Sequence, residues 1–313
     1  MTKFRRGLTV EQWAGLRVLQ DAAGNNWWKD LLNLWALPGH SSHDHGLRLC
    51  VHLHSLDFYR RGQRIAHVCF GHARSGVAPA RMEIHERYVH GRKGGKVYLT
   101  MGAEGLPYEG QQGIERCIAR SVPKHGSEKW AVDDIVGNNP GVVDLEMGIP
   151  GSALRVDIVS LAEGTVAPLL LLWEAKPLNS NDLRLENDGP AKIISQINKY
   201  KAFCSEEENT NALEKAYAES CKTLVKLAQW AGKTEQLSKL IVRGQHGVSL
   251  DPQVGLLLFR GVTTDADGER GLVPYASNWC HHRAKLSGRG LRLKEKEDPK
   301  NIVLTLAPDT DEG

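Results

Sequence analysis

The chain has 313 residues, 41% of them hydrophobic and 25% charged, and its formal net charge at pH 7 is only +3. This is the composition of an ordinary globular protein, long enough for one large domain or two smaller ones. So small a charge excludes nucleic-acid binding by overall basicity, and any phosphate-binding surface must be a local patch.

The cysteines and apolar residues indicate a soluble, cytoplasmic protein without a membrane partner. The six cysteines form no CxxC pair and are irregularly spaced, which favours reduced thiols over disulfides. Residues 1–6 are charged and precede no long apolar run of the kind that a signal peptide requires. The longest strongly apolar run, residues 169–173, is far too short to cross a bilayer.

The first third of the chain predicts a helix followed by a β-meander. A tryptophan-rich apolar pattern over residues 9–37 predicts the helix, which Pro38 and Gly39 end. The predicted strands are 47–59, 64–70, 82–89 and 97–101, with a turn at 60–63. The Gly- and Pro-rich stretch 102–113 marks a boundary, so we expect one domain over 1–106 and a second over 107–313.

The second part alternates helices with strands, which predicts an α/β domain. The predicted helices are 114–122, 190–203, 211–230, 234–242 and 277–286, and the predicted strands are 142–147, 153–161, 166–175, 254–259 and 302–306. Helices would lie on both sides of a short sheet. The absence of GxGxxG, P-loop and GxSxG motifs disfavours one rival hypothesis, a small-molecule enzyme on another α/β fold.

Two charged residues end the most apolar predicted strand. The run 169–173 is apolar on both faces, as in a central strand, and is followed by Glu174, Ala175 and Lys176. Glu174 and Lys176 are two residues apart, so they share one face of the strand. A hairpin centred near residues 165–166 would place Asp157 of the preceding strand opposite Glu174.

Two carboxylates that close repel each other, and a hard divalent cation removes the conflict. Asp157 and Glu174 are therefore candidate ligands of Mg²⁺ or Mn²⁺. Lys176 could orient or deprotonate a water beside the metal, or stabilise charge on a phosphate. The alternative is a structural ion pair at the end of the sheet.

An aspartate on one strand, followed by Glu-x-Lys at the end of the next apolar strand, resembles the PD-(D/E)xK superfamily of restriction-endonuclease-like nucleases. Gln196 and Tyr200, four residues apart on the following helix, are similar to a Gln-xxx-Tyr pattern of recombination exonucleases in that superfamily. This resemblance covers roughly residues 113–203. One departure is that Val156, and not a proline, precedes the aspartate.

The resemblance implies a restriction-endonuclease-like α/β core with a central mixed sheet flanked by helices, joined to the N-terminal helix and β-meander. It implies the carbonyl of Ala175 as a third protein ligand, Gln196 and Tyr200 as braces, and an acid from an earlier helix in the metal shell. Glu115 is the best match for that acid, and Glu109 is a weaker one. The expected activity is Mg²⁺-dependent deoxyribonuclease action, as a DNA endonuclease.

Other basic residues are candidates for contacts with the nucleic-acid backbone, by the attraction of cations to phosphates. These are Arg61, Arg92, Lys93 and Lys96 at the two hairpin tips, with Lys199 on the helix. Ordinary solvated hairpin tips explain them equally well. Cutting both strands of a duplex requires two sites, so a homodimer is expected. The rival hypothesis is a catalytically inactive nucleic-acid-binding or scaffold protein on the same fold, and RNA cleavage or exonuclease action also stays open.

Overall fold

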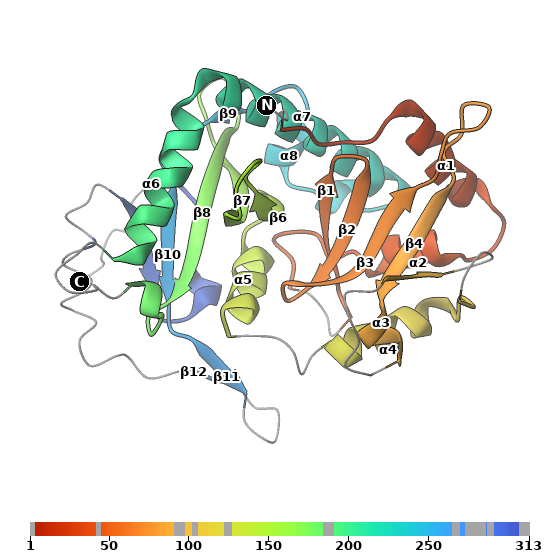
Figure 1. The fold of residues 1–313 in the computed structure, drawn as a ribbon, viewed down its shortest axis with the longest axis horizontal. Helices are drawn as coiled ribbons and strands as arrows, with labels where there is room; N and C mark the ends of the chain where they lie inside the picture. The colour runs from red at the N-terminus through yellow and green to blue at the C-terminus, as the bar shows by residue number, and fades with distance from the viewer. Residues whose placement is uncertain are drawn as a thin grey trace.

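The computed structural model describes residues 4–41, 45–90, 98–101, 106–121, 127–183, 191–264, 270–272, 286 and 291–306. Two sheets lie side by side in the molecule, and helices pack against both of them (Figure 1). The fold is therefore mixed α/β, as the alternation of predicted elements indicated. The basic tip with Arg92, Lys93 and Lys96 and nearly all of the predicted helix 277–286 lie outside the described residues.

The N-terminal sheet is an antiparallel meander whose five strands are neighbours in chain order, as predicted. Its strands are β1 (Arg48–His52), β2 (Ser55–Arg60), β3 (Gln63–Phe70), β4 (Ala80–His85) and β5 (Tyr98–Met101). Its helices are α1 (Val10–Asp21), α2 (Trp27–Leu34), α3 (Glu86–His90) and α4 (Gly110–Ser121). Helix α4 lies after the predicted boundary, yet it packs against α2, α3 and β3.

Three predicted elements of this part are divided in the structure. The single helix over 9–37 is two helices, because the side chain of Asn26 caps α2. The single strand over 47–59 is the β1–β2 hairpin, with His54 in its turn at φ 61°. The strand predicted over 82–89 ends at His85 and continues as α3. The turn at 60–63 is confirmed, since Arg60 pairs with Gln63 across it.

The second sheet is mixed, with strand order β13-β10-β8-β7-β6 and β9 pairing with β8. Its strands are β6 (Val142–Gly148), β7 (Arg155–Ala162), β8 (Leu169–Pro177), β9 (Ser249–Leu250), β10 (Gly255–Phe259) and β13 (Arg292–Lys296), while β11 (Val262–Thr264) and β12 (Arg270–Leu272) form a separate hairpin. Strand β8 is central: β7 is antiparallel to it, and β10 is parallel to it.

Helices cover both faces of this mixed sheet. They are α5 (Ser127–Asn138), α6 (Lys192–Ser205), α7 (Glu207–Trp230) and α8 (Lys239–Gly244), with short 3₁₀ turns η2 (Asn181–Leu183), η3 (Thr234–Gln236) and η4 (Pro299–Asn301). Leu170 and Leu172 of β8 pack into the core that α6 and α7 share. Leu171 and Trp173 face the opposite core, which α5 covers. The two-sided apolar pattern of the strand is thereby explained.

The C-terminal prediction is wrong in its details. Residues 302–306 do not form a strand; the side chain of Asn139 instead hydrogen-bonds to the backbone of Ile302 and Leu304. The last strand of the sheet is β13, whose charged sequence RLKEK gives no apolar alternation. Helix α7 starts at Glu207 and not at Asn211.

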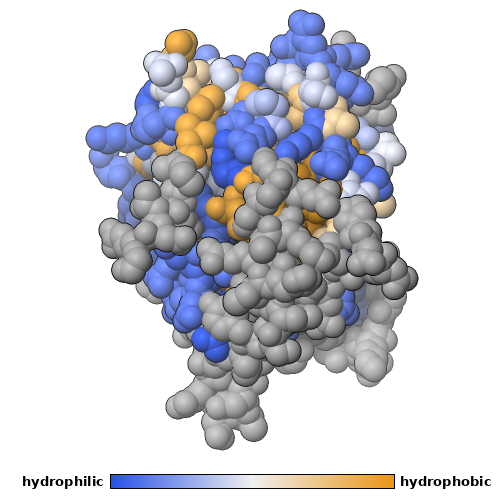
Figure 2. Space-filling model, turned by 90° about the vertical axis from the view of Figure 1, so that its left-hand side faces the viewer, coloured by the Kyte–Doolittle hydropathy of each residue, from blue (hydrophilic) through white to orange (hydrophobic). Residues whose placement is uncertain are grey.

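On the side of the molecule where α6 lies, the described surface is largely hydrophilic, with smaller hydrophobic patches between (Figure 2). None of the helices in the described parts of the chain is long and apolar enough to span a membrane. The five cysteines in these parts are free thiols, as predicted.

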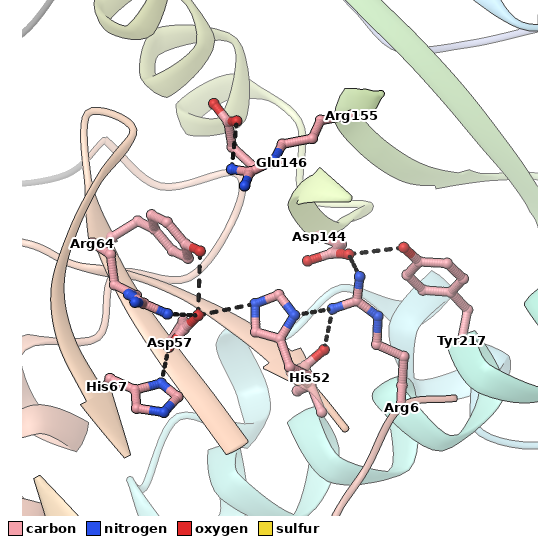
Figure 3. Close-up of polar contacts among 11 residues, drawn as sticks. Arg6, His52, Asp57, Arg64, His67, Asp144, Glu146, Arg155 and Tyr217 are labelled. Carbon is pink, nitrogen blue, oxygen red and sulfur yellow. Dashed lines mark hydrogen bonds and ion pairs between the residues drawn. The ribbon is translucent and has the colours of Figure 1, made fainter. Parts of the chain in front are cut away.

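The two sheets are joined where β1 lies against β6, and α7 packs on both strands. Arg6, in the segment before α1, is buried at this junction and forms an ion pair with Asp144 of β6 at 2.5 Å. It also donates to the carbonyl of Val51, and Tyr217 of α7 donates to the same carboxylate at 2.8 Å (Figure 3). The side chains of Arg6 and Asp144 are only 4% and 1% exposed, so the charge of each depends on the other.

We expect Arg6→Met to destabilise the protein by about 3–5 kcal/mol, because it leaves the carboxylate of Asp144 buried without a cation. The free energy of unfolding from urea titration measures this. The matched control is Arg5→Met, at the exposed neighbouring arginine, which should change that energy by at most about 0.5 kcal/mol. Equal effects of the two substitutions would refute the role of the ion pair.

Candidate functional site

Strands β7 and β8 place Asp157 and Glu174 side by side, as the hairpin pattern predicted. Their ladder runs from Ala162 paired with Leu169 to Ile158 paired with Trp173. One further step along the ladder puts Asp157 opposite Glu174. Oδ2 of Asp157 also accepts a hydrogen bond from the Ala175 amide at 2.8 Å, which fixes the carboxylate at the end of β8.

The ammonium group of Lys176 lies at the centre of the site. Around its Nζ are Oε1 of Glu174 at 2.8 Å, the carbonyl oxygen of Ala175 at 3.1 Å, Oε1 of Glu128 at 3.5 Å and Oδ2 of Asp157 at 3.7 Å. Four oxygens from three elements therefore face one point. The side chain of Glu174 is 1% exposed and that of Lys176 is 8% exposed, so the charges are largely withdrawn from water.

Helix α6 braces the buried carboxylate of Glu174 through Gln196 and Tyr200. The amide of Gln196 donates to Oε1 of Glu174 at 2.8 Å and also lies 2.5 Å from the Tyr200 hydroxyl. That hydroxyl is 2.6 Å from the carbonyl of Arg155 and 3.1 Å from Oε2 of Glu174. A hydroxyl has one proton, so it can donate to only one of these two acceptors at a time. The predicted pair thus meets the predicted acid.

The acid that joins from an earlier helix is Glu128, which the sequence interpretation missed. It lies in the first turn of α5, a helix that was not predicted and that packs on β8. The expected acid, Glu115, lies on α4 against the first sheet and accepts a hydrogen bond from Gln111. Glu109 forms an ion pair with Arg116 instead. The helical spacing of Ala131 and Ile135, both buried, was the available signal for α5.

Burial dominates the electrostatics of the site. It raises the pKa of Asp157 well above its usual value, and the charge of Glu174 raises it further. Burial also raises the pKa of Glu174, although Lys176 opposes this effect. Burial alone would lower the pKa of Lys176, but the nearby acids Asp157, Glu174 and Glu128 outweigh it and raise the pKa. Lys176 is therefore an ammonium ion, able to donate hydrogen bonds but not to accept a proton.

The donor set suits a hard cation. Three carboxylates and one backbone carbonyl supply only oxygen atoms, which are the ligands that Mg²⁺ and Mn²⁺ prefer. Oxygens of Asp157 and Glu174 lie within 3.7 Å of the same nitrogen, so they lie on one side of the sheet. The three carboxylates do not all come within 4.8 Å of one another around Lys176, so a metal would need them to close in.

A polar cleft lies between the first sheet and β6–β7. It has a volume of about 530 Å³ and is lined by Arg64, Lys129 and Arg155 together with acids such as Glu146. Lys129 adjoins Glu128 in the chain, and Arg155 lies two residues before Asp157. The cleft is therefore lined by close sequence neighbours of two of the acids around Lys176.

Two of the basic residues predicted to contact nucleic acid, Arg61 and Lys199, lie in different parts of the described structure. The guanidinium of Arg61, at the tip of the β2–β3 turn, stacks over the ring of Trp130 on α5. Beside it, Lys129 donates to the carbonyl of Gly62 in the same turn at 3.1 Å. Lys199 is exposed on α6, next to Tyr200. Only the first of the two predicted basic tips can thus be related to the cleft.

No known protein family, curated protein or solved structure matches this chain. The resemblance of the Asp157 and Glu174 pattern to one nuclease superfamily is therefore an expectation. The chemistry of the site has to follow from its own atoms.

We expect Lys176→Met to destabilise the fold by about 3–5 kcal/mol at pH 8, because it removes the cation from between buried carboxylates. This loss of unfolding free energy should shrink as the pH falls. The carboxyl groups whose pKa is raised in the folded state then take up protons in that state before they do in the unfolded chain, and a neutral carboxyl group does not need the lysine. Unfolding in EDTA between pH 5 and 8, with the exposed Lys192→Met as control, measures the effect. A loss that is the same at every pH would show that the charges do not cause it.

Proposed function

We propose that this protein is a metal-dependent nuclease that hydrolyses phosphodiester bonds of nucleic acid, acting as an endonuclease on double-stranded DNA. The observation that carries the proposal is the convergence of four oxygens on Lys176 at the end of a central strand. A hard cation and a fixed positive charge close together stabilise the charge that develops in phosphoryl transfer, and these residues supply the ligands and that charge.

The proposal assigns a role to each residue of the site. Asp157, Glu174 and the carbonyl of Ala175 hold Mg²⁺ or Mn²⁺, which when bound supplies Lewis-acid activation of a phosphate oxygen and of water. Lys176, as an ammonium ion, orients the attacking water or stabilises charge on the phosphate. In the metal-free site the surrounding acids raise the pKa of Lys176. Gln196 and Tyr200 hold Glu174 in place.

The polar cleft supports nucleic acid as the substrate. Its cations Arg64, Lys129 and Arg155 could contact phosphates of a bound strand, and Lys129 adjoins Glu128 in the chain. Glu146 lies within 3.9 Å of Arg155 and 3.7 Å of Lys129, so part of this charge is neutralised. We therefore expect modest, salt-sensitive binding, and a homodimer where both strands of a duplex are cut.

Asp157→Asn and Glu174→Gln should each lower the rate of DNA cleavage at least about 100-fold, because each removes a charged ligand. Both substitutions also reduce repulsion between buried acids, so the fold should be retained. The assay incubates circular and linear DNA, and RNA, with Mg²⁺, Mn²⁺ or EDTA, and Lys192→Met is the active control. Loss of activity in EDTA should accompany the losses in the variants.

The absence of cleavage by the wild-type chain under all these conditions would overturn the proposal. The alternative, a catalytically inactive nucleic-acid-binding or scaffold protein, predicts a different result. In that case labelled DNA is bound, with a dependence on salt, but never cut. Binding without cleavage would thus favour the alternative.

The acid contributed by α5 can be tested by a matched pair of substitutions. Glu128→Gln should lower the cleavage rate about 10-fold or more or raise the Mg²⁺ concentration needed, since Glu128 lies 3.5 Å from Nζ of Lys176. Glu115→Gln, on a helix that packs on the first sheet, should leave both quantities unchanged. The opposite ranking, measured as rate against Mg²⁺ concentration, would refute this assignment of the acid.

A further inference from the structure

A second cluster of metal-binding side chains lies on the first sheet, away from Lys176. His67 and Cys69 lie two residues apart on β3, so they share a face, and Glu83 of β4 is the ladder partner of His67. A ring nitrogen, the sulfur and a carboxylate oxygen of these residues all lie within 4.8 Å of one another. All three side chains are partly exposed, so an ion could reach them from solvent.

The atoms of this cluster select a particular class of metal. Nitrogen, thiolate sulfur and carboxylate oxygen together suit a borderline-soft ion, above all Zn²⁺, whereas Mg²⁺ and Ca²⁺ prefer oxygen alone. We infer that His67, Cys69 and Glu83 form a zinc-binding site with a fourth position open to water or another ligand. Ligand atoms around zinc stand closer together than 4.8 Å, so any pair of these atoms near that limit has to move inward on binding.

Asp57 of β2 supplies the support that a metal-binding histidine needs. Its Oδ1 lies 2.5 Å from Nδ1 of His67, and a carboxylate in this position fixes the tautomer and orientation of the ring (Figure 3). When Nδ1 donates to Asp57, Nε2 keeps its lone pair for a metal. The other oxygen of Asp57 is engaged by His52 and Arg64, so its carboxylate is itself held in place.

Without metal, Cys69 and Glu83 already interact with each other. The Cys69 thiol hydrogen-bonds to Glu83, and burial followed by the charge of this acid raises the pKa of Cys69 to about 11. A zinc ion would replace the thiol proton between the sulfur and the carboxylate. The same two groups are therefore already oriented toward each other.

The donors of this site differ from those of the proposed nuclease centre, although His67 and Asp57 line the same polar cleft as Arg64 and Lys129. The donors around Lys176 are all oxygens, and those around Cys69 are mixed. An excess of Mg²⁺ should therefore fill the first without displacing zinc from the second. Failure of either proposal leaves the other standing.

The test is a titration of the full-length reduced protein with Zn²⁺ against a chromophoric chelator, in the presence of excess Mg²⁺. One zinc per chain should be bound, and it should be retained in Glu174→Gln. Cys69→Ser should weaken this binding at least about 100-fold, and Asp57→Asn about 10- to 100-fold, the range for residues that orient a ligand. His72→Asn, at an exposed histidine close to β3 in the chain, is the control that should bind as the wild type does.

Co²⁺ gives a second measurement, in which the spectrum of the wild-type protein alone reports whether sulfur is a ligand. The wild-type protein with Co²⁺ should show a thiolate-to-cobalt charge-transfer band, and Cys69→Ser should lack it. The inference is overturned if the wild type binds no zinc under these conditions. It is equally overturned if Cys69→Ser and His72→Asn bind zinc alike, or if the Co²⁺ complex shows no sulfur ligand.

Discussion

The repulsion between Asp157 and Glu174 is the constraint on which the candidate site depends. Two neighbouring strands hold these carboxylates together, and the surrounding core withdraws them from water. Such a pair needs a positive charge, and Lys176 provides it from the end of β8, the strand that carries Glu174. The lysine thereby keeps together a set of ligands that would otherwise separate, and we propose that a divalent cation completes it.

The hairpin register could be predicted because it follows from local sequence. A short loop after residue 161 and an unbroken apolar run at 169–173 predict a hairpin, and a centre near residues 165–166 places Asp157 opposite Glu174, as the structure has it. Gln196 and Tyr200 follow from helical spacing in the same way. The meander was predictable too, apart from the turn at His54, because alternating strands and turn residues are also local signals.

The remaining parts depend on contacts between distant segments. Glu128 could not be assigned without α5, and charged β13 joins the sheet only because β10 offers it a parallel edge. The cluster of His67, Cys69 and Glu83 depends on the register between β3 and β4. The sequence does not give this register, because the predicted strand ends differ from the observed ones. The order of helices along a chain likewise does not say which one returns to a given strand, and Glu115 was therefore the wrong choice.

Three consecutive residues of α5 connect the acids with the first sheet. Glu128 faces Lys176, Lys129 bonds to the carbonyl of Gly62, and Trp130 lies under Arg61. The first turn of α5 thus contacts both the β2–β3 turn and the group of carboxylates around Lys176. Any molecule that displaces this turn must also shift Glu128, and the number of acids facing the lysine then changes with it.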